Sequence, residues 1–226
     1  LVTAMAHMPV QGRNPRSFDG HDMVFPVSEW VREGMISAGA PSWSAPLYGL
    51  AALDPKRNDA SARIVRSSRY DWDKRKLRDR LLGVLSPLAR PFTRAYPFER
   101  RPGLTLGIVS RLTPIKQFPQ LFDRLAPVLA RFPSVNLEIF GSGGYASVRD
   151  LDAALKPIAE RARFWGQQRD VRAVYTQLDY LLTGLPEKEA LGLNVIEAQA
   201  CDLPVLAVKA PPFIETVCDG VTGYFY

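Results

Sequence analysis

The sequence is poor in cysteine and has no long apolar run. Its two cysteines, Cys201 and Cys218, stand in no C-x-x-C or Cys/His ligand spacing, so neither a disulfide framework nor a zinc site is expected. No apolar stretch approaches the roughly 18 residues of a transmembrane helix, and no signal-peptide or lipidation pattern is present. These absences argue against disulfide-rich secreted and membrane-spanning classes and favour a protein of the reducing cytoplasm.

The chain has 226 residues, of which 46% are hydrophobic, and a formal net charge of +6. This composition is enough for a packed globular core. The charge is concentrated in 54–101, where fourteen Lys and Arg stand against six Asp and Glu. In this segment four leucines fall on one helical face, namely Leu77, Leu81, Leu85 and Leu88. The pattern predicts an amphipathic helix that either lies on an anionic membrane surface or packs its leucines against the protein. No recognised nucleic-acid motif accompanies the basic charge, so no nucleic-acid partner is expected.

Apolar runs of strand type alternate with amphipathic helical patterns from residue 103 onward. The strand-like runs lie at 104–110, 135–140, 164–165, 178–184 and 204–208. The helical patterns lie at about 121–129, 148–162 and 195–200. Such alternation predicts an α/β class with a Rossmann-like parallel sheet, helices on both faces and ligands at the carboxyl ends of the strands.

The first fifty residues predict the end of a second α/β domain. Two strands are expected within LVTAMAHM and MVFPVS, followed by a helix that Ser28 caps and that ends before Gly39. We therefore expect three parts: an N-terminal domain end at 1–50, a basic linker at 51–102 and a Rossmann-like domain at 103–226. Because the chain begins inside an apolar stretch and ends just after a glycine turn, we expect it to be a piece of a longer protein.

The stretch EALGLNVIEAQACDLPVLA carries the strongest chemical signal. Glu189 lies in a glycine-containing loop and Glu197 lies eight positions later, inside the predicted helix. A carboxylate in the helix can accept hydrogen bonds from both hydroxyls of a ribose, and one in the loop can bind sugar hydroxyls. The amides of Gly192, Leu193 and Asn194 lie at the helix start, where an anion is favoured. By itself, a glutamate in a helix is more often a solvated surface residue.

Two further signals follow the first two strands of the same domain. Arg111 and Lys116 lie in SRLTPIKQF, where a guanidinium and an ammonium can clamp a diphosphate and stabilise a leaving nucleotide. Gly141 and Gly143 follow the second strand and allow either close approach of a ligand or a tight turn. The stretch FWGQQRD at 164–170 can meet a base edge or simply end a strand with a turn, and the second interpretation is favoured.

In this order, these motifs resemble the C-terminal donor domain of glycosyltransferase family 4, over about 120 residues. The motifs are SRLTPIK, LEIFGSGG, FWG, EALGLNVIEAQACDLPVLA and ETVCDGVTG. The resemblance implies a GT-B fold and retaining transfer from a nucleoside diphosphate sugar without a metal or other cofactor. It assigns Arg111 and Lys116 to the diphosphate, Glu197 to the ribose and Glu189 to the sugar. VFPVSEWVREGMISAGAP resembles the end of that family's N-terminal domain, and LVTAMAH resembles a strand that ends in an active-site histidine, which would be His7.

The sequence departs from the family pattern around the predicted sugar site. Ala190 and Leu191 stand where an aromatic residue and a glycine are usual, and Pro211 and Pro212 stand where a glycine pair is common. These departures concern the fit of the sugar more than that of the nucleotide. A D-x-D string in the basic segment, ending at Asp73, resembles the metal-binding string of another glycosyltransferase fold, but we interpret it as surface charge away from any sheet edge.

The leading hypothesis is a hexosyltransferase that acts on a glycan or lipid-linked acceptor, as in polysaccharide or lipopolysaccharide synthesis, in the cytoplasm or on the inner face of the membrane. One alternative is a nucleotide-sugar epimerase of the same fold. Another is a non-catalytic subunit that binds nucleotide sugar or serves assembly. The intact set of Arg111, Lys116, Glu189 and Glu197 argues against a mere scaffold.

Overall fold

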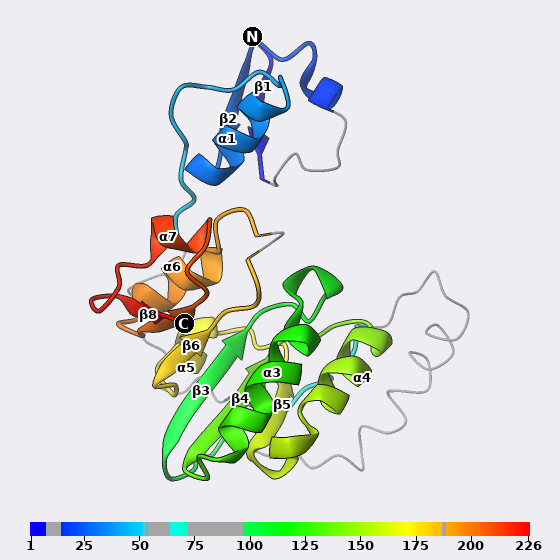
Figure 1. Ribbon diagram of the computed structural model, residues 1–226, viewed down its shortest axis with the longest axis vertical. Coiled ribbons are helices and arrows are strands. Elements are labelled where there is room, and N and C mark those ends of the chain that lie inside the picture. The colour runs from blue at the N-terminus through cyan, green and yellow to red at the C-terminus, as the bar shows by residue number, and fades with distance from the viewer. Residues whose placement is uncertain (8–14, 52, 54–63, 72–96, 187–188) are drawn as a thin grey trace. The chain divides into compact units, whose positions relative to one another are not determined.

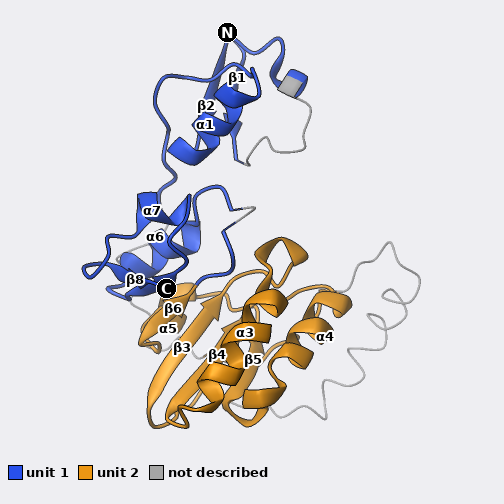
Figure 2. Ribbon diagram, in the orientation of Figure 1, with its two compact units in different colours: residues 1–53, 183–226 blue, residues 54–182 orange. Residues whose placement is uncertain are grey.

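The computed structural model describes residues 1–7, 15–51, 53, 64–71, 97–186 and 189–226 (Figure 1). The chain forms two compact units, coloured separately in Figure 2. Unit 1 combines Leu1–Leu53 with Thr183–Tyr226, and unit 2 is Asp54–Leu182. The predicted α/β class with a parallel sheet is confirmed, since six strands follow the order β5-β4-β3-β6-β7-β8. The predicted domain boundaries remain a prediction.

Unit 2 contains the larger part of the sheet. Its strands are β3 (Leu104–Val109), β4 (Val135–Phe140), β5 (Ala162–Gly166) and β6 (Tyr180–Leu182). Its helices are η3 (Pro114–Lys116), α3 (Phe118–Ala130), α4 (Tyr145–Ala154), η4 (Lys156–Arg161) and α5 (Val171–Tyr175). Strand β3 pairs in parallel with β4 on one side and with β6 on the other, and β5 extends the sheet beyond β4. The carboxyl ends of these strands therefore share one edge.

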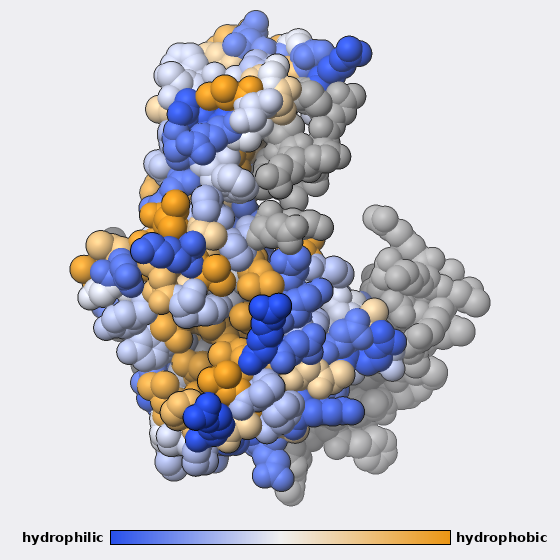
Figure 3. All heavy atoms as spheres, in the orientation of Figure 1, coloured by the Kyte–Doolittle hydropathy of each residue, from blue (hydrophilic) through white to orange (hydrophobic). Residues whose placement is uncertain are grey.

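The apolar residues of unit 2 explain its layers. Strand β4 is almost wholly buried, including its two polar residues Asn136 and Glu138, as expected for a strand covered on both faces. Helices α3 and α4 lie side by side against the sheet (Figure 1). Helix α4 buries Val148, Leu151 and Ala154, while its outward face is hydrophilic (Figure 3). This amphipathic division is what binds the helix to the sheet.

One predicted helix is wrong in its second half. The pattern from 148 to 162 predicts one continuous helix, but α4 ends at Ala154 and the chain continues as the 3-10 helix η4. Pro157 lies at the start of η4, and proline has no backbone N–H and does not fit a helix interior. Ala162 begins β5 instead of ending a helix.

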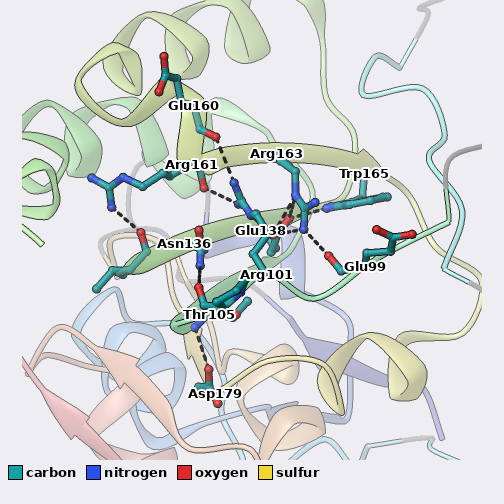
Figure 4. Close-up of polar contacts among 12 residues, drawn as sticks. Glu99, Arg101, Thr105, Asn136, Glu138, Glu160, Arg161, Arg163, Trp165 and Asp179 are labelled. Atoms are coloured by element: carbon teal, nitrogen blue, oxygen red, sulfur yellow. Dashed lines mark hydrogen bonds and ion pairs between the residues drawn. The ribbon is translucent and has the colours of Figure 1, made fainter. Parts of the chain in front are cut away.

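A buried carboxylate holds three segments of unit 2 together (Figure 4). Glu138 on β4 is fully buried and accepts hydrogen bonds from Arg101 at 3.0 Å, Arg163 at 2.5 Å and Trp165 Nε1 at 2.6 Å. Burial is the main cause that lowers the pKa of Arg101, and the Glu138 carboxylate opposes this shift. Because two guanidiniums balance the buried charge, the network links the segment before β3 to β4 and β5.

Unit 1 contains two short parallel strand pairs and three α-helices among the described residues. Its elements are β1 (Thr3–Ala6), η1 (Pro15–Phe18), β2 (Met23–Pro26), α1 (Glu29–Ser37), α6 (Leu193–Gln199), β7 (Val205–Ala207), α7 (Phe213–Thr216) and β8 (Gly223–Phe225). The N-terminal strands and the helix that Ser28 caps are confirmed, although the strands are shorter than predicted. Gly39, just past the helix, has a φ of 68°. The left-handed backbone there explains why glycine follows this helix.

The predicted amphipathic helix of the basic segment, with Leu77, Leu81, Leu85 and Leu88, lies outside the described residues. Within the described ranges, no helix is long and apolar enough to cross a membrane.

Candidate functional site

The predicted basic pair lies at the carboxyl end of β3. Arg111 follows Ser110 in the loop and is exposed, while Lys116 is half-buried and ends η3. Gln117, the next residue, has a φ of 53°, which turns the chain directly into α3. Strand β3 lies between β4 and β6, so both cations lie near the middle of the shared strand edge of unit 2. The guanidinium of Arg111 and the ammonium of Lys116 at this place can bind an anion such as a diphosphate.

Gly141 and Gly143 are needed by the chain itself. A Cβ on Gly141 would fall 1.9 Å from the carbonyl oxygen of Ser110, and one on Gly143 would fall 2.0 Å from that of Leu112. The two loops are also joined by backbone bonds, since Leu112 N donates to Ser142 O at 2.8 Å. The group that approaches both glycines is therefore the loop that carries Arg111, and the two roles that the sequence left open, approach of a ligand and a tight turn, stay predictions.

A segment that the sequence assigned to the linker lies over these loops. Gly143 donates to the carbonyl of Arg69 at 3.1 Å, and Asp71 N donates to Gly143 O at 2.8 Å. Asp71 is therefore at the sheet edge, and its placement away from any sheet edge was wrong. The reason is that backbone bonds join Arg69 and Asp71 to Gly143 after β4, and Ser67 to Trp165 of β5, and no side-chain pattern reveals such bonds. Asp73, the other acid of the D-x-D string, lies outside the described residues.

The FWGQQRD stretch is largely occupied by internal contacts. Trp165 is buried and donates to Glu138. The side chain of Gln168 donates to the carbonyls of Val65 and Trp165 at 3.0 and 2.9 Å. Ser67 donates from its hydroxyl to the carbonyl of Gln167 at 3.0 Å. These contacts favour the structural interpretation of this stretch over base recognition by its side chains.

The predicted sugar and ribose residues lie together in unit 1, around the start of α6. Glu189 is half-buried, and one of its carboxylate oxygens accepts from the amide of Ala190 at 3.3 Å. Gly192 is the N-cap of α6 with a φ of 80°, and Leu193 and Asn194 form the first turn. Glu197 is half-buried one turn later. The loop and the helix thus present two carboxylates on either side of a helix start, the arrangement that the motif predicts.

The residues that depart from the family pattern have a packing role. Ala190 and Leu191 are buried in one apolar cluster of unit 1 that also includes residues of β1, β2 and α1. The members contributed by the N-terminal part are Ala6, Val24, Val27, Val31, Met35 and Ala40. His7 directly follows Ala6 at the carboxyl end of β1 and is exposed. The predicted histidine therefore adjoins the apolar cluster that buries the residues next to Glu189.

The predicted residues thus fall into two groups. Arg111, Lys116, Gly141 and Gly143 come together in unit 2, and His7, Glu189, Gly192, Leu193, Asn194 and Glu197 belong to unit 1. Sequence reasoning missed the contacts of Ser28 and Glu215 in unit 1, although the first was predicted as a cap and the second lies in the ETVCDGVTG motif. In the part of the chain that the structure describes, no three His, Cys, Asp or Glu side chains are grouped to hold a metal ion.

Several solved structures share the architecture of this chain. The structure of Anabaena Alr3699/HepE in complex with UDP and glucose matches 99% of this chain and 57% of its own, with a TM-score of 0.64 and 19% identity. The pneumococcal O-GlcNAc transferase GtfA in complex with UDP and GlcNAc matches 99% of this chain and 40% of its own, with a TM-score of 0.60 and 16% identity. At these identities the likeness shows the fold, which is that of GT-B enzymes.

Curated relatives match about half of the chain. A D-inositol 3-phosphate glycosyltransferase of Segniliparus rotundus is 32% identical over 125 residues, which are 52% of this chain and 27% of the relative. A GDP-mannose-dependent alpha-(1-6)-phosphatidylinositol monomannoside mannosyltransferase of Mycolicibacterium smegmatis is 32% identical over 124 residues, which are 51% and 32% of the two chains. The chain thus spans about a third or less of these relatives' length. Residues 94–226 match the family Glycosyl transferases group 1, and the chain belongs to this family.

Proposed function

We propose that the chain is the donor-binding part of a retaining glycosyltransferase of the family 4 type. It takes a sugar from a nucleoside diphosphate sugar and uses no metal ion. The observation that carries the proposal is the family match over 94–226 together with the ordered set of Arg111, Lys116, Glu189 and Glu197 within it. Each of these side chains has the chemistry that one part of such a donor requires.

We assign the basic pair to the diphosphate. Arg111 and Lys116 neutralise the charge that develops on the leaving nucleotide, which is the stabilisation that a metal ion supplies in other enzymes. The glycines Gly141 and Gly143 keep the loop of Arg111 close to its neighbour. The amides of Gly192, Leu193 and Asn194 add donors at the start of α6.

We assign the carboxylates to the hydroxyl groups of the donor. Glu197 accepts hydrogen bonds from the ribose hydroxyls, and Glu189 accepts them from the hydroxyls of the transferred sugar. His7 is the active-site residue that we assign to the N-terminal part of the chain. The transition state of such a transfer has oxocarbenium character, so a leaving diphosphate that is held and neutralised lowers the barrier.

The acceptor is a glycan or a lipid-linked glycan. One relative supports a lipid-linked acceptor, since it is a phosphatidylinositol monomannoside mannosyltransferase, while another is a D-inositol 3-phosphate glycosyltransferase. The excess of eight positive charges in 54–101 fits attachment to an anionic leaflet of the inner membrane face. Cosedimentation with vesicles of rising phosphatidylserine content tests this attachment, which should weaken as salt is added.

A binding and turnover series tests the function. We expect thermal shifts with a nucleoside diphosphate and its sugar from a panel of UDP, GDP, ADP and their glucose, mannose and N-acetylglucosamine derivatives, because a ligand that binds the folded state raises its apparent stability. Donor turnover that requires an acceptor and survives EDTA supports the proposal. Donor conversion without acceptor would indicate the epimerase alternative, and binding without any turnover in the protein that contains this chain would indicate a non-catalytic subunit.

A further inference from the structure

Three backbone amides in the first turn of α1 donate hydrogen bonds to side-chain oxygens of residues that precede the helix or lie far from it in the sequence. The amides of Glu29 and Trp30 donate to the carboxylate of Glu215 at 2.7 and 2.8 Å. The amide of Val31 donates to Ser28 Oγ at 3.1 Å. These amides have no intrahelical partner, so the helix start depends on both side chains.

Glu215 reaches the helix from α7, in the other sequence segment of unit 1. It is half-buried and also accepts from the hydroxyl of Tyr48 at 3.2 Å. Burial and the adjacent carboxylate raise the pKa of Tyr48, so this hydroxyl keeps its proton and remains a donor. A carboxylate at a helix start is favoured by the exposed amides and by the helix dipole.

Ser28 has a second contact that leads to the predicted sugar loop. Its hydroxyl is fully buried and donates to the carbonyl of Ala190 at 2.5 Å while it accepts from Val31. Ala190 directly follows Glu189, and its side chain and that of Leu191 are buried against β1, β2 and α1. A Cβ on Gly49 would fall 2.7 Å from Leu193, so the chain after α1 also runs close to the end of this loop.

We propose that Ser28 and Glu215 are positioning residues of the donor-sugar site. Ser28 fastens the start of α1 to the loop that carries Glu189, and Glu215 holds the same helix start from α7. We call Ser28, Glu215 and Tyr48 the α1 clasp. The inference rests on the proposed function, since it takes Glu189 as the sugar-binding carboxylate. It goes beyond that function by assigning a positioning role to Ser28 and Glu215, which touch neither nucleotide nor phosphate in the assignments above.

The clasp holds its loop at Ala190, directly after the carboxylate assigned to the sugar and before the α6 amides that add donors to the diphosphate. The main cations assigned to the diphosphate, Arg111 and Lys116, belong to unit 2, whereas the clasp belongs to unit 1. Loss of the clasp should therefore lower the affinity for the sugar nucleotide and the rate of transfer, while the affinity for the bare nucleoside diphosphate stays nearly the same. A misplacement of about 1 Å in a positioned group can lower turnover about a hundredfold.

Isothermal calorimetry with the full chain tests the clasp, using the nucleoside diphosphate and the matching sugar nucleotide that give the largest thermal shifts in the panel. The variants are Ser28→Ala, Glu215→Ala and Glu215→Gln, with Glu33→Gln as the control, since Glu33 is an exposed acid on the same helix. We expect the first two variants to keep diphosphate affinity within about twofold and to lose about tenfold or more of the sugar nucleotide's affinity. Glu215→Gln keeps an oxygen acceptor and should recover part of that loss, and the control should match the unchanged chain.

Two results would overturn the role of the clasp. One is an equal loss for both ligands in Ser28→Ala and Glu215→Gln, which would indicate general damage to the fold. The other is unchanged binding of both ligands in every variant. If Glu215→Ala does not fold, Ser28→Ala and Tyr48→Phe test the clasp instead. The deciding quantity is again the loss of affinity for the sugar nucleotide relative to that for the nucleoside diphosphate. Failure of the unchanged chain to bind any member of the panel would instead contradict the proposed function.

Discussion

Two glutamates, one in each compact unit, hold together segments that are far apart in the sequence. Glu138 in unit 2 is fully buried and is bonded to the guanidiniums of Arg101 and Arg163 and to the indole of Trp165 (Figure 4). Glu215 in unit 1 is half-buried and accepts from the backbone amides of α1. Glu138 is thus bonded to two cations and one neutral donor, whereas the described bonds of Glu215 come from neutral donors.

This difference indicates that Glu138 stabilises the fold, whereas Glu215 positions a functional site. Removing Glu138 would leave two guanidiniums near a buried position without their counter-charge, which is a large penalty in a low-dielectric interior. Removing Glu215 would leave helix amides that water can reach, because its surroundings are half-exposed. We therefore expect unit 2 to depend on its carboxylate for stability and unit 1 to depend on its carboxylate mainly for loop position.

The largest effect expected is the loss of stability in Glu138→Ala. We expect about 3 to 5 kcal/mol, the range for breaking a buried ion pair, against about 1 to 2 kcal/mol for Glu215→Ala, the range for losing a helix cap. Glu160→Ala, which changes an exposed acid close to Arg101, serves as the control and should be near neutral. Urea unfolding followed by circular dichroism measures all three. Equal losses for Glu138→Ala and Glu215→Ala would remove the contrast between the two carboxylates.

The sequence predicts the elements of both units better than their connections. The mainly apolar runs that form β3 and β4, and the serine that caps α1, each follow from a local rule. Helix α4 ended early because Pro157 interrupts a pattern that is otherwise apolar at helical spacing. Local patterns therefore sufficed wherever one segment determines its own conformation.

The contacts that could not be predicted are all non-local. The bond between Ser28 and Ala190 joins residues 162 positions apart, and the bond from Asp71 to Gly143 uses only the backbone. A single sequence carries no signal for such pairs, because Ser28 already has a local role as a cap. The motifs could therefore name Glu189 as a site residue but not the side chains that hold its loop.

A smaller effect, on binding alone, should distinguish the cations of unit 2. Arg111→Ala and Lys116→Ala should each weaken binding of the nucleoside diphosphate by about 1.5 to 3 kcal/mol, the range for hydrogen bonds to charged groups. Binding of the nucleoside should stay nearly unchanged, because the partners of both side chains are phosphates. Arg124→Ala, at an exposed arginine of α3, is the control for a general loss of positive charge. Calorimetry that finds equal losses for nucleoside and diphosphate would rule out the phosphate assignment.

The smallest effect should separate the two carboxylates beside α6. Glu197→Ala should weaken the binding of every ribonucleotide, with or without a sugar, because the partner of Glu197 is the ribose. Glu189→Ala should leave the nucleoside diphosphate unaffected and weaken only the sugar nucleotide or its turnover. Both side chains are half-buried, so we expect about 1.5 kcal/mol for each, at the low end for a bond to a charged group.

Calorimetry with the nucleoside diphosphate and its sugar measures the difference between Glu197→Ala and Glu189→Ala directly. Glu189→Gln and Glu197→Gln keep the shape of each side chain and show how much of the loss depends on charge. If Glu189→Ala weakens the bare diphosphate as much as Glu197→Ala does, Glu189 does not bind the sugar. The α1 clasp would then hold a loop whose carboxylate binds the nucleotide, and the sugar-binding residue would have to be sought elsewhere in the protein.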